Sequence, residues 1–476
     1  MDKELAALEE AIEDIASLAR RMGLDFFPVC FELCPADVIY TFGAYGMPTR
    51  FSHWSFGKHF RRLKMQYDYN LSRIYELVIN SDPCYAFLLE GNSLVQNKLV
   101  IAHVFGHSDF FKNNCYFSYT SRKMVETMAV HAAKMREYEF KYGRREVEIF
   151  LDAAMAVQEH IEPLGPLSKL NRDGEGEEEE KTDRESNREP TRQTPYDDLW
   201  ALDRTPVKPK YQERPKKIPL RPCKDVIGFI MRHSSILEDW QRDILAMLRE
   251  EMLYFWPQLQ TKIMNEGWAT YWHVRIMREL DLPDEEAVEF ARLNAFVLQP
   301  AKMHINPYYV GLKIFEDIER RWDNLTEEEE YCDPGRKKGQ GREKIFEVRS
   351  LENDVSFLRN YLTKELVEEL DLYLYERVGN EWVVVEKDWE KVRDGLVSRL
   401  VNCGYPYIVV EDADYDRRGE LYLKHCYEGL ELDIPYLEKT LQHVYLLWGR
   451  PVHLETVVEG KKTIFSYDGK KNTRRS

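Results

Sequence analysis

Residues 99–111 read LVIAHVFGHSDFF, an apolar run that carries two histidines four positions apart, His103 and His107. The spacing of apolar residues predicts a helix over about 93–112. In an α-helix, side chains at positions i and i+4 project from one face, about 5–6 Å apart at Cβ. Both imidazoles are therefore placed to reach one metal ion.

A second segment, residues 264–273, reads MNEGWATYWH and places Glu266 inside an apolar helical pattern. Zinc-binding helix pairs use a glutamate of this kind as their third ligand. His273 follows seven positions later, close to two turns at 3.6 residues per turn, so it shares a face with Glu266. We therefore predict a divalent-metal site held by His103, His107 and Glu266, with His273 as a fourth ligand or a proton-transfer group. Zinc is the first choice, and iron and manganese also suit two histidines and a carboxylate.

The segment departs from the zinc-protease motif HExxH, because Val104 occupies the position of the general-base glutamate. A valine side chain cannot take a proton, so a catalytic base would have to come from elsewhere. The sequence offers five candidates for a base or for a group beside the ligands, without ranking them: Asp109, Glu126, His160, Glu162 and His273. It offers four candidate pocket residues: Asn265, Trp268, His304 and Tyr308.

Structural roles explain the same residues without a metal. Histidines at i and i+4 also occur as core or interface residues. An ionisable side chain such as Glu266, bordered by Ile263, Trp268 and Trp272, needs a partner when buried, and an arginine would serve. Helix capping by Asn306 before Pro307 likewise accounts for the segment that contains Tyr308.

Several longer strings carry a resemblance. They are AHVFGHSDFFKNN at 102–114, HIEPL at 160–164, EDWQR at 238–242, QTKIMNEGWAT at 260–270 and INPYYVG at 305–311. In content and order they resemble the SpoVR family, the stage V sporulation protein R-like proteins, over about residues 5–468. The resemblance implies a role in spore cortex formation in endospore-forming bacteria, and the family also occurs in bacteria that do not sporulate. It supplies no molecular activity.

Composition bounds the class of protein. A chain of 476 residues with 43% hydrophobic and 13% aromatic residues is long enough for two or three domains, and most of it is expected to pack. The net charge of −16 argues against binding to nucleic-acid phosphates, which requires a basic surface. The eight cysteines form no C-x-x-C pair, so free thiols are expected.

The expected location is the cytoplasm. The first residues, MDKELA, contain no positive region followed by an apolar run, so no secretory signal is predicted. No stretch approaches the roughly 20 apolar residues that span a bilayer. Binding to protein partners stays an open prediction, and the sequence does not identify a substrate.

The predicted fold class is α+β, a mainly helical body followed by a small antiparallel α+β domain. The expected parts are a helical body in two halves, 1–171 and 223–325, an acidic and then proline-rich insertion at 172–222, a connector with a helix at 326–370, the α+β domain at 371–468 and a basic tail at 469–476. Within the body we expect helices that include 56–80, 258–279 and 284–297. Strands are expected at 372–377, 382–386, 407–411, 420–424, 452–457 and 462–466.

Three functional hypotheses follow. The first is a metal-dependent hydrolase with a zincin-like helix pair and gluzincin-like ligands, acting on a peptide, an amide or a cell-wall precursor. The second is a metal-stabilised regulatory or scaffold protein without catalysis, which Val104 favours. The third is an interaction protein without metal, whose histidines belong to the core. A bound metal would separate the third hypothesis from the other two.

Overall fold

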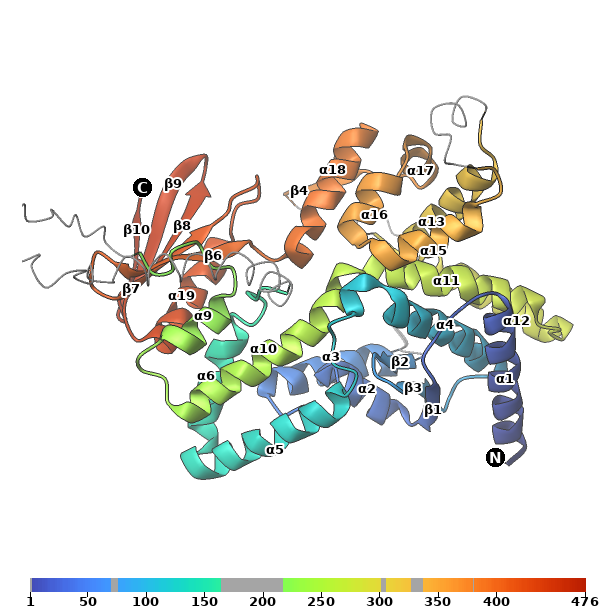
Figure 1. Ribbon diagram of the computed structural model, residues 1–476, viewed down its shortest axis with the longest axis horizontal. Coiled ribbons are helices and arrows are strands. Elements are labelled where there is room, and N and C mark those ends of the chain that lie inside the picture. The colour runs from blue at the N-terminus through green and yellow to red at the C-terminus, as the bar shows by residue number, and fades with distance from the viewer. Residues whose placement is uncertain (1, 70–75, 164–216, 301–304, 327–336, 380) are drawn as a thin grey trace, which may run out of the picture. The chain divides into compact units, whose positions relative to one another are not determined.

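A computed structural model describes residues 2–69, 76–163, 217–300, 305–326, 337–379 and 381–476 of the chain (Figure 1). The chain forms two compact units, each built from two separate stretches. Unit 1 contains residues 1–151 and 250–405, and unit 2 contains residues 152–249 and 406–476. The two compact units begin and end at other positions than the expected domains do. The domain boundaries therefore stay a prediction. The expected insertion lies outside the described residues up to position 216.

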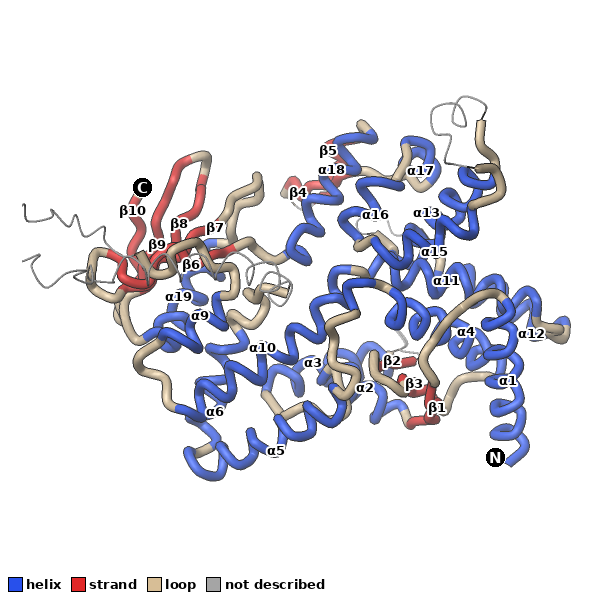
Figure 2. Tube along the Cα trace, viewed as in Figure 1, coloured by secondary structure: helices blue, strands red, loops and turns tan. Residues whose placement is uncertain are grey.

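Unit 1 is mainly helical (Figure 2). Its helices are α1 (Asp2–Arg21), α2 (Ala36–Tyr45), α3 (Trp54–Asp68), α4 (Leu94–Asn113), η1 (Cys115–Phe117), α5 (Met124–Tyr142), α11 (Lys262–Glu279), α12 (Asp284–Val297), α13 (Pro307–Asp323), α15 (Gly341–Leu351), α16 (Asp354–Tyr361), α17 (Lys364–Glu369), α18 (Trp389–Leu400) and η3 (Val401–Gly404). Two further helices, α6 (Arg144–Met155) and α10 (Asp239–Gln260), run across the division between the units.

Unit 1 also holds two small sheets. Strands β1 (Val29–Cys34), β3 (Cys84–Leu89) and β2 (Glu76–Ile79) form one sheet in that order, with β1 parallel and β2 antiparallel to β3. Strands β4 (Leu374–Val378) and β5 (Glu381–Glu386) form an antiparallel hairpin. The helix expected over 56–80 is wrong at residues 76–79, where apolar and β-branched side chains suit the pairing with β3.

Unit 2 is built on a five-stranded sheet with the order β10-β9-β8-β7-β6. Its elements are α9 (Val226–His233), β6 (Ile408–Tyr415), β7 (Glu420–His425), α19 (Ile434–Trp448), β8 (Val452–Val458), β9 (Lys461–Tyr467) and β10 (Asn472–Arg475). The α+β class is confirmed. The sheet is mixed rather than antiparallel, because β7 connects to β8 through α19 and the two strands lie parallel. The strands expected at 372–386 pair only with each other among the described strands.

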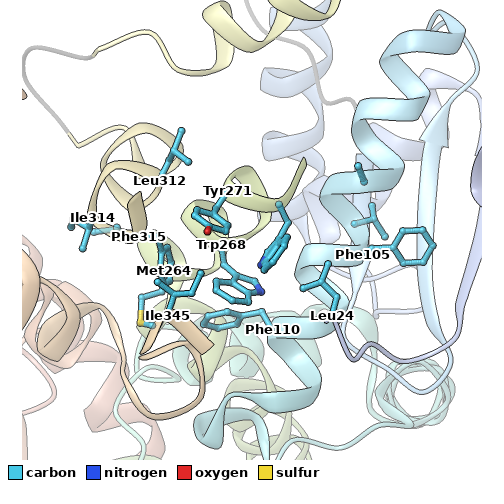
Figure 3. Packing of buried hydrophobic residues seen from close by; sticks show 14 of the residues in the cluster. Leu24, Phe105, Phe110, Met264, Trp268, Tyr271, Leu312, Ile314, Phe315 and Ile345 are labelled. Carbon is cyan, nitrogen blue, oxygen red and sulfur yellow. The ribbon is translucent and has the colours of Figure 1, made fainter. Parts of the chain in front are cut away.

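The core of unit 1 forms around α4 and α11, which lie side by side, while α13 packs on α11 (Figure 1). Residues 100–111 of α4 are all buried, as in a helix that is covered on every face. Figure 3 shows the Trp268 ring of α11 among Phe110, Met264 and Tyr271. This core fixes the positions of the two helices that carry the predicted ligands.

Candidate metal centre

Helix α4 presents two histidines and α11 presents one glutamate to the same point. His103 Nε2 lies 3.3 Å from Glu266 Oε2, and His107 Nε2 lies 3.5 Å from the same oxygen. One ligand atom from each of the three residues lies within 4.8 Å of the other two. The structure therefore brings together the three residues for which the sequence predicted a metal.

Glycines allow the helices to approach closely enough for these contacts. A Cβ atom at Gly106 of α4 would lie 2.6 Å from the Cα atom of Ala269 in α11. A Cβ atom at Gly267 of α11 would lie 2.4 Å from the Cα atom of Gly311 in α13. Glycine inside a helix costs about 0.5–1 kcal/mol relative to alanine. Here the glycines let α4 cross α11 closely beside His103 and His107, and let α11 cross α13 closely beside Glu266.

The N-terminal ends of both helices are capped. Ser93 and Gln96 form a reciprocal capping box at the start of α4. At the start of α11 the side chain of Thr261 makes no cap, and the buried carboxylate of Asp354 accepts hydrogen bonds from the backbone N–H groups of Ile263 (2.8 Å) and Met264 (2.9 Å). Burial raises the pKa of Asp354 to about 7, although both N–H bonds act in the opposite direction. These caps fix the start of each ligand-bearing helix.

The protonation states at neutral pH suit metal binding. Burial, with a smaller effect from His103, lowers the pKa of His107 to about 4, so its imidazole is neutral. Burial would raise the pKa of Glu266, but its interactions with His103 and His107 act in the opposite direction, and the net shift is downward. Glu266 therefore carries a carboxylate. A neutral imidazole offers a ring nitrogen lone pair, as a metal ligand must.

The donor spacing fits a metal ion of ordinary size. Zinc–nitrogen and zinc–oxygen bonds of about 2.0–2.2 Å in a tetrahedron place neighbouring donors about 3.3–3.6 Å apart. The two distances to Glu266 Oε2, 3.3 Å from His103 and 3.5 Å from His107, lie in this interval. None of the lysines or arginines that the structure describes forms an ion pair with Glu266. The alternative of a buried arginine partner is thus not what the described residues show.

The edges of the two histidine rings that point away from Glu266 also contact polar side chains. His107 Nδ1 lies 2.9 Å from Asn265 Oδ1. His103 Nδ1 lies 3.0 Å from His273 Nδ1, and the Tyr308 ring of α13 stacks on His103 with 5.8 Å between the ring centroids. Burial, followed by the charge of His103, lowers the pKa of His273 to about 3. His273 therefore contacts, as a neutral ring, the side of His103 that faces away from Glu266.

Asp109, a candidate base, is engaged in holding helices together. It is fully buried, its Oδ1 accepts a hydrogen bond from the backbone N–H of Asp25 (2.8 Å), and its Oδ2 accepts one from Trp268 Nε1 (2.8 Å). Arg349 of α15 approaches Oδ2 to 3.5 Å. Burial raises the pKa of Asp109 to about 6, although Arg349 and both hydrogen bonds lower it. Asp109 thus connects α4 with α11 and α15.

The remaining predicted site residues are scattered. Glu126 is exposed in the first turn of α5, and the Trp268 ring lies in the core of unit 1. His160 and Glu162 belong to unit 2, where the backbone carbonyl of His160 accepts a hydrogen bond from Val226. His304 lies outside the described residues.

Sequence reasoning missed Asn294 of α12, whose Oδ1 lies 3.2 Å from His273 Nε2. It also missed Asp354 and Arg349. No local motif marks any of the three, because each reaches its partner only through the packing of distant helices. The available signal was weaker: a buried histidine needs a hydrogen-bond partner, and one had to exist for His273.

Comparison with known proteins places the chain in a family. A family model described as "SpoVR like protein" matches residues 2–405, and one described as "SpoVR-like C-terminal domain" matches residues 406–459. The chain belongs to the SpoVR family. The junction between the two matches coincides with the passage of this SpoVR protein from unit 1 to unit 2 after Tyr405. The family resemblance of the sequence strings is therefore confirmed.

One curated relative of this SpoVR protein is "Uncharacterized protein YcgB" of Escherichia coli strain K12. The two are 30% identical over 473 residues, which cover 94% of this chain and 91% of the relative. No solved structure matches. Among the helices that the structure describes, none combines the length and the apolar character required to cross a bilayer.

Proposed function

We propose that this SpoVR protein holds one divalent metal ion between His103, His107 and Glu266, with zinc as the first choice and iron or manganese as alternatives. One observation carries the proposal: two histidine ring nitrogens converge on one carboxylate oxygen at 3.3 and 3.5 Å, with no lysine or arginine paired to it among the described residues. A carboxylate with little access to solvent and no paired basic side chain is costly, and a cation offsets that cost.

The proposed reaction class is hydrolysis of a peptide, an amide or a cell-wall precursor. Three protein ligands leave a fourth position of a tetrahedral ion open, as in catalytic zinc sites. A metal in this position would polarise a carbonyl group and acidify bound water. His103, His107 and Glu266 would hold the ion, and the buried surroundings would restrict access of solvent. The proposed setting is spore cortex or envelope formation, served from the cytoplasm.

A second candidate is a regulatory or scaffold protein that binds metal and acts through protein partners. Val104, in the position of the usual base, is fully buried. Asp109 is held by Asp25, Trp268 and Arg349, and His273 by His103 and Asn294. These observations favour a metal centre without a general base.

Elemental analysis tests the metal directly. Wild-type protein would be purified without added metal, beside His103→Ala, Glu266→Ala and a control, His425→Ala. His425 is also a buried histidine, bonded to Thr456 within the sheet of unit 2. We expect about one ion per chain in the wild type and the control, and loss in both site variants. Folded wild type that holds no metal after reconstitution would overturn the proposal.

Turnover then separates the two candidates. Metal-loaded wild type, and Glu266→Ala exposed to the same metal, would be offered amide, peptide and cell-wall-fragment substrates. Metal-dependent turnover that is lost in the variant supports the hydrolase. Stoichiometric metal without turnover, together with a partner that binds only the metal-loaded protein, supports the scaffold.

A further inference from the structure

A line of polar groups runs from α12 to the proposed metal position. Asn294 Oδ1 lies 3.2 Å from His273 Nε2, and His273 Nδ1 lies 3.0 Å from His103 Nδ1. His103 Nε2, the other nitrogen of that ring, faces Glu266 at 3.3 Å. Both ring nitrogens of His273 therefore have partners, an arrangement that favours a positioning role over the predicted role of fourth ligand.

The direction of each hydrogen bond follows from the chemistry of its ends. The amide oxygen of Asn294 can only accept, so the proton lies on His273 Nε2. A neutral imidazole carries one N–H, which leaves His273 Nδ1 as an acceptor. Two ring nitrogens 3.0 Å apart share one proton, and it must then lie on His103 Nδ1. In a neutral ring of this tautomer, His103 Nε2 carries a lone pair on the side of Glu266, where the metal is proposed to bind.

His107 is arranged in the same way by a shorter connection. Its Nδ1 lies 2.9 Å from Asn265 Oδ1, which can only accept, so His107 also carries its proton on Nδ1. Its Nε2 lone pair faces Glu266 at 3.5 Å. In these tautomers two lone pairs and a carboxylate oxygen converge, an arrangement that a cation stabilises.

We propose that Asn294 and His273 are positioning residues, which hold His103 in its Nδ1–H tautomer and keep the Nε2 lone pair directed at the metal. This inference rests on the proposed metal site and adds to it the residues that prepare the ligand before the ion arrives. Outer partners of ligating histidines fix ring orientation and tautomer in this way in metal proteins. The relay uses a residue of α12 that contacts no proposed ligand.

Helix α12 is anchored firmly enough to serve this role. Ser93 Oγ donates a hydrogen bond to Glu289 (2.7 Å), and Lys98 forms an ion pair with Glu286 (2.7 Å), so α12 contacts both α4 and its N-cap residue. Phe290 of α12 packs in a small apolar cluster with Val95 and Met277. The position of Asn294 is thus set by contacts that do not involve the ligands.

Variants at His273 and Asn294 test the relay. In His273→Asn the side-chain oxygen offers an acceptor near the former Nδ1 position, whereas His273→Leu removes the acceptor. Asn294→Leu keeps the side-chain size but removes the amide, and Arg292→Ala on the exposed side of α12 is the control. We expect His273→Leu and Asn294→Leu to bind zinc about 10–100-fold more weakly in competition with a chelating indicator. His273→Asn should retain most of the affinity, with or without Asn294→Leu.

The second readout is the tautomer itself in metal-free protein. Nitrogen-15 spectra of labelled histidine rings distinguish Nδ1–H from Nε2–H, and a merely structural role for Asn294 would not move the proton of His103. We expect His103 to be Nδ1–H in the wild type and to shift towards Nε2–H in Asn294→Leu. An unchanged tautomer in Asn294→Leu, or zinc affinity within about twofold of the wild type in both leucine variants, would overturn the relay. If the wild type binds no metal but the tautomer of His103 still shifts in Asn294→Leu, only the metal site would be overturned.

Discussion

Glu266 of α11 and Glu251 of α10 are both glutamates of unit 1 in contact with histidine, but their charges are balanced differently. Glu251 is 1% exposed, lies 3.2 Å from His131 Nδ1 and forms a salt bridge with Arg50 at 2.8 Å. Glu266 contacts His103 and His107, and none of the described lysines or arginines pairs with it. In the first cluster, Arg50 balances the negative charge of Glu251. In the second cluster, the proposed metal ion would supply the positive charge.

Residue type alone therefore does not distinguish a metal centre from a buried ion pair. Arg50 supplies a fixed positive charge that cannot be removed by deprotonation, and its guanidinium also lies over the rings of Phe51, Phe56 and Phe255. Neutral imidazoles supply lone pairs instead of charge. What decides between the two outcomes is the partner that the tertiary fold brings to the carboxylate.

The largest expected effect comes from removing Arg50. Arg50→Ala leaves the buried carboxylate of Glu251 without its guanidinium, and we expect a loss of about 3–5 kcal/mol in the free energy of unfolding, measured with urea. Metal content should stay at the wild-type level, because the proposed metal ligands are untouched. Loss of metal from a folded Arg50→Ala protein would break the distinction between the two clusters.

Glu266→Gln should make stability independent of zinc. At free zinc about 100-fold above its dissociation constant, wild type should gain about 2.7 kcal/mol in the free energy of unfolding, and Glu266→Gln much less. Glu251→Gln is the matched control, which should be less stable than the wild type but keep the zinc-dependent gain. Equal gains in wild type and Glu266→Gln would show that zinc binds elsewhere.

Gly106→Ala tests the close crossing of α4 and α11. The new Cβ atom would meet Ala269 Cα at 2.6 Å, so we expect a loss of about 1–3 kcal/mol and weaker zinc binding. Gly57→Ala in the exposed part of α3 meets nothing within 4 Å and should instead stabilise the protein by about 0.5–1 kcal/mol. The same response of both variants to urea would contradict the packing argument.

Acid should destabilise the metal-free protein through its buried histidines. The pKa of His107 falls to about 4 and that of His273 to about 3 in the folded chain, from 6.5. The unfolded chain therefore binds more protons between about pH 6.5 and pH 4, and stability is lost as the pH falls through this interval. Each histidine contributes about 1.4 kcal/mol per pH unit there. Urea titrations at several pH values in the presence of chelator should show that the free energy of unfolding depends less steeply on pH in His273→Asn than in the wild type. The same dependence in both proteins would contradict this role of His273.

Much of the helical framework follows from local sequence. The helix expected over 284–297 coincides with α12, and the one expected over 258–279 contains α11, because apolar spacing records which face is buried. The sequence analysis did not predict strands β1 and β3. Val29 pairs with Cys84, and no sequence pattern near either residue indicates a partner so far along the chain. Short strands in an aromatic, turn-rich segment carry little periodic signal.

The same limit applies within the site. His103 and His107 are neighbours on one helix, so their shared direction was predictable from spacing. Asp354 reaches Ile263 across 91 positions of sequence, and Asn294 reaches His273 from another helix. Asp109 was predicted as a candidate base from its place beside the histidines, yet its oxygens point to Asp25 and Trp268. Side-chain direction depends on the packed neighbours, which spacing does not reveal.

X-ray absorption at the metal edge tests the central claim most directly. Wild-type protein loaded with one equivalent of zinc should show two imidazole ligands and oxygen donors at about 2.0–2.2 Å, and His107→Ala should lose one imidazole contribution. Sulfur donors at about 2.3 Å, or a spectrum without imidazole scattering, would place the zinc elsewhere and contradict the centre formed by His103, His107 and Glu266.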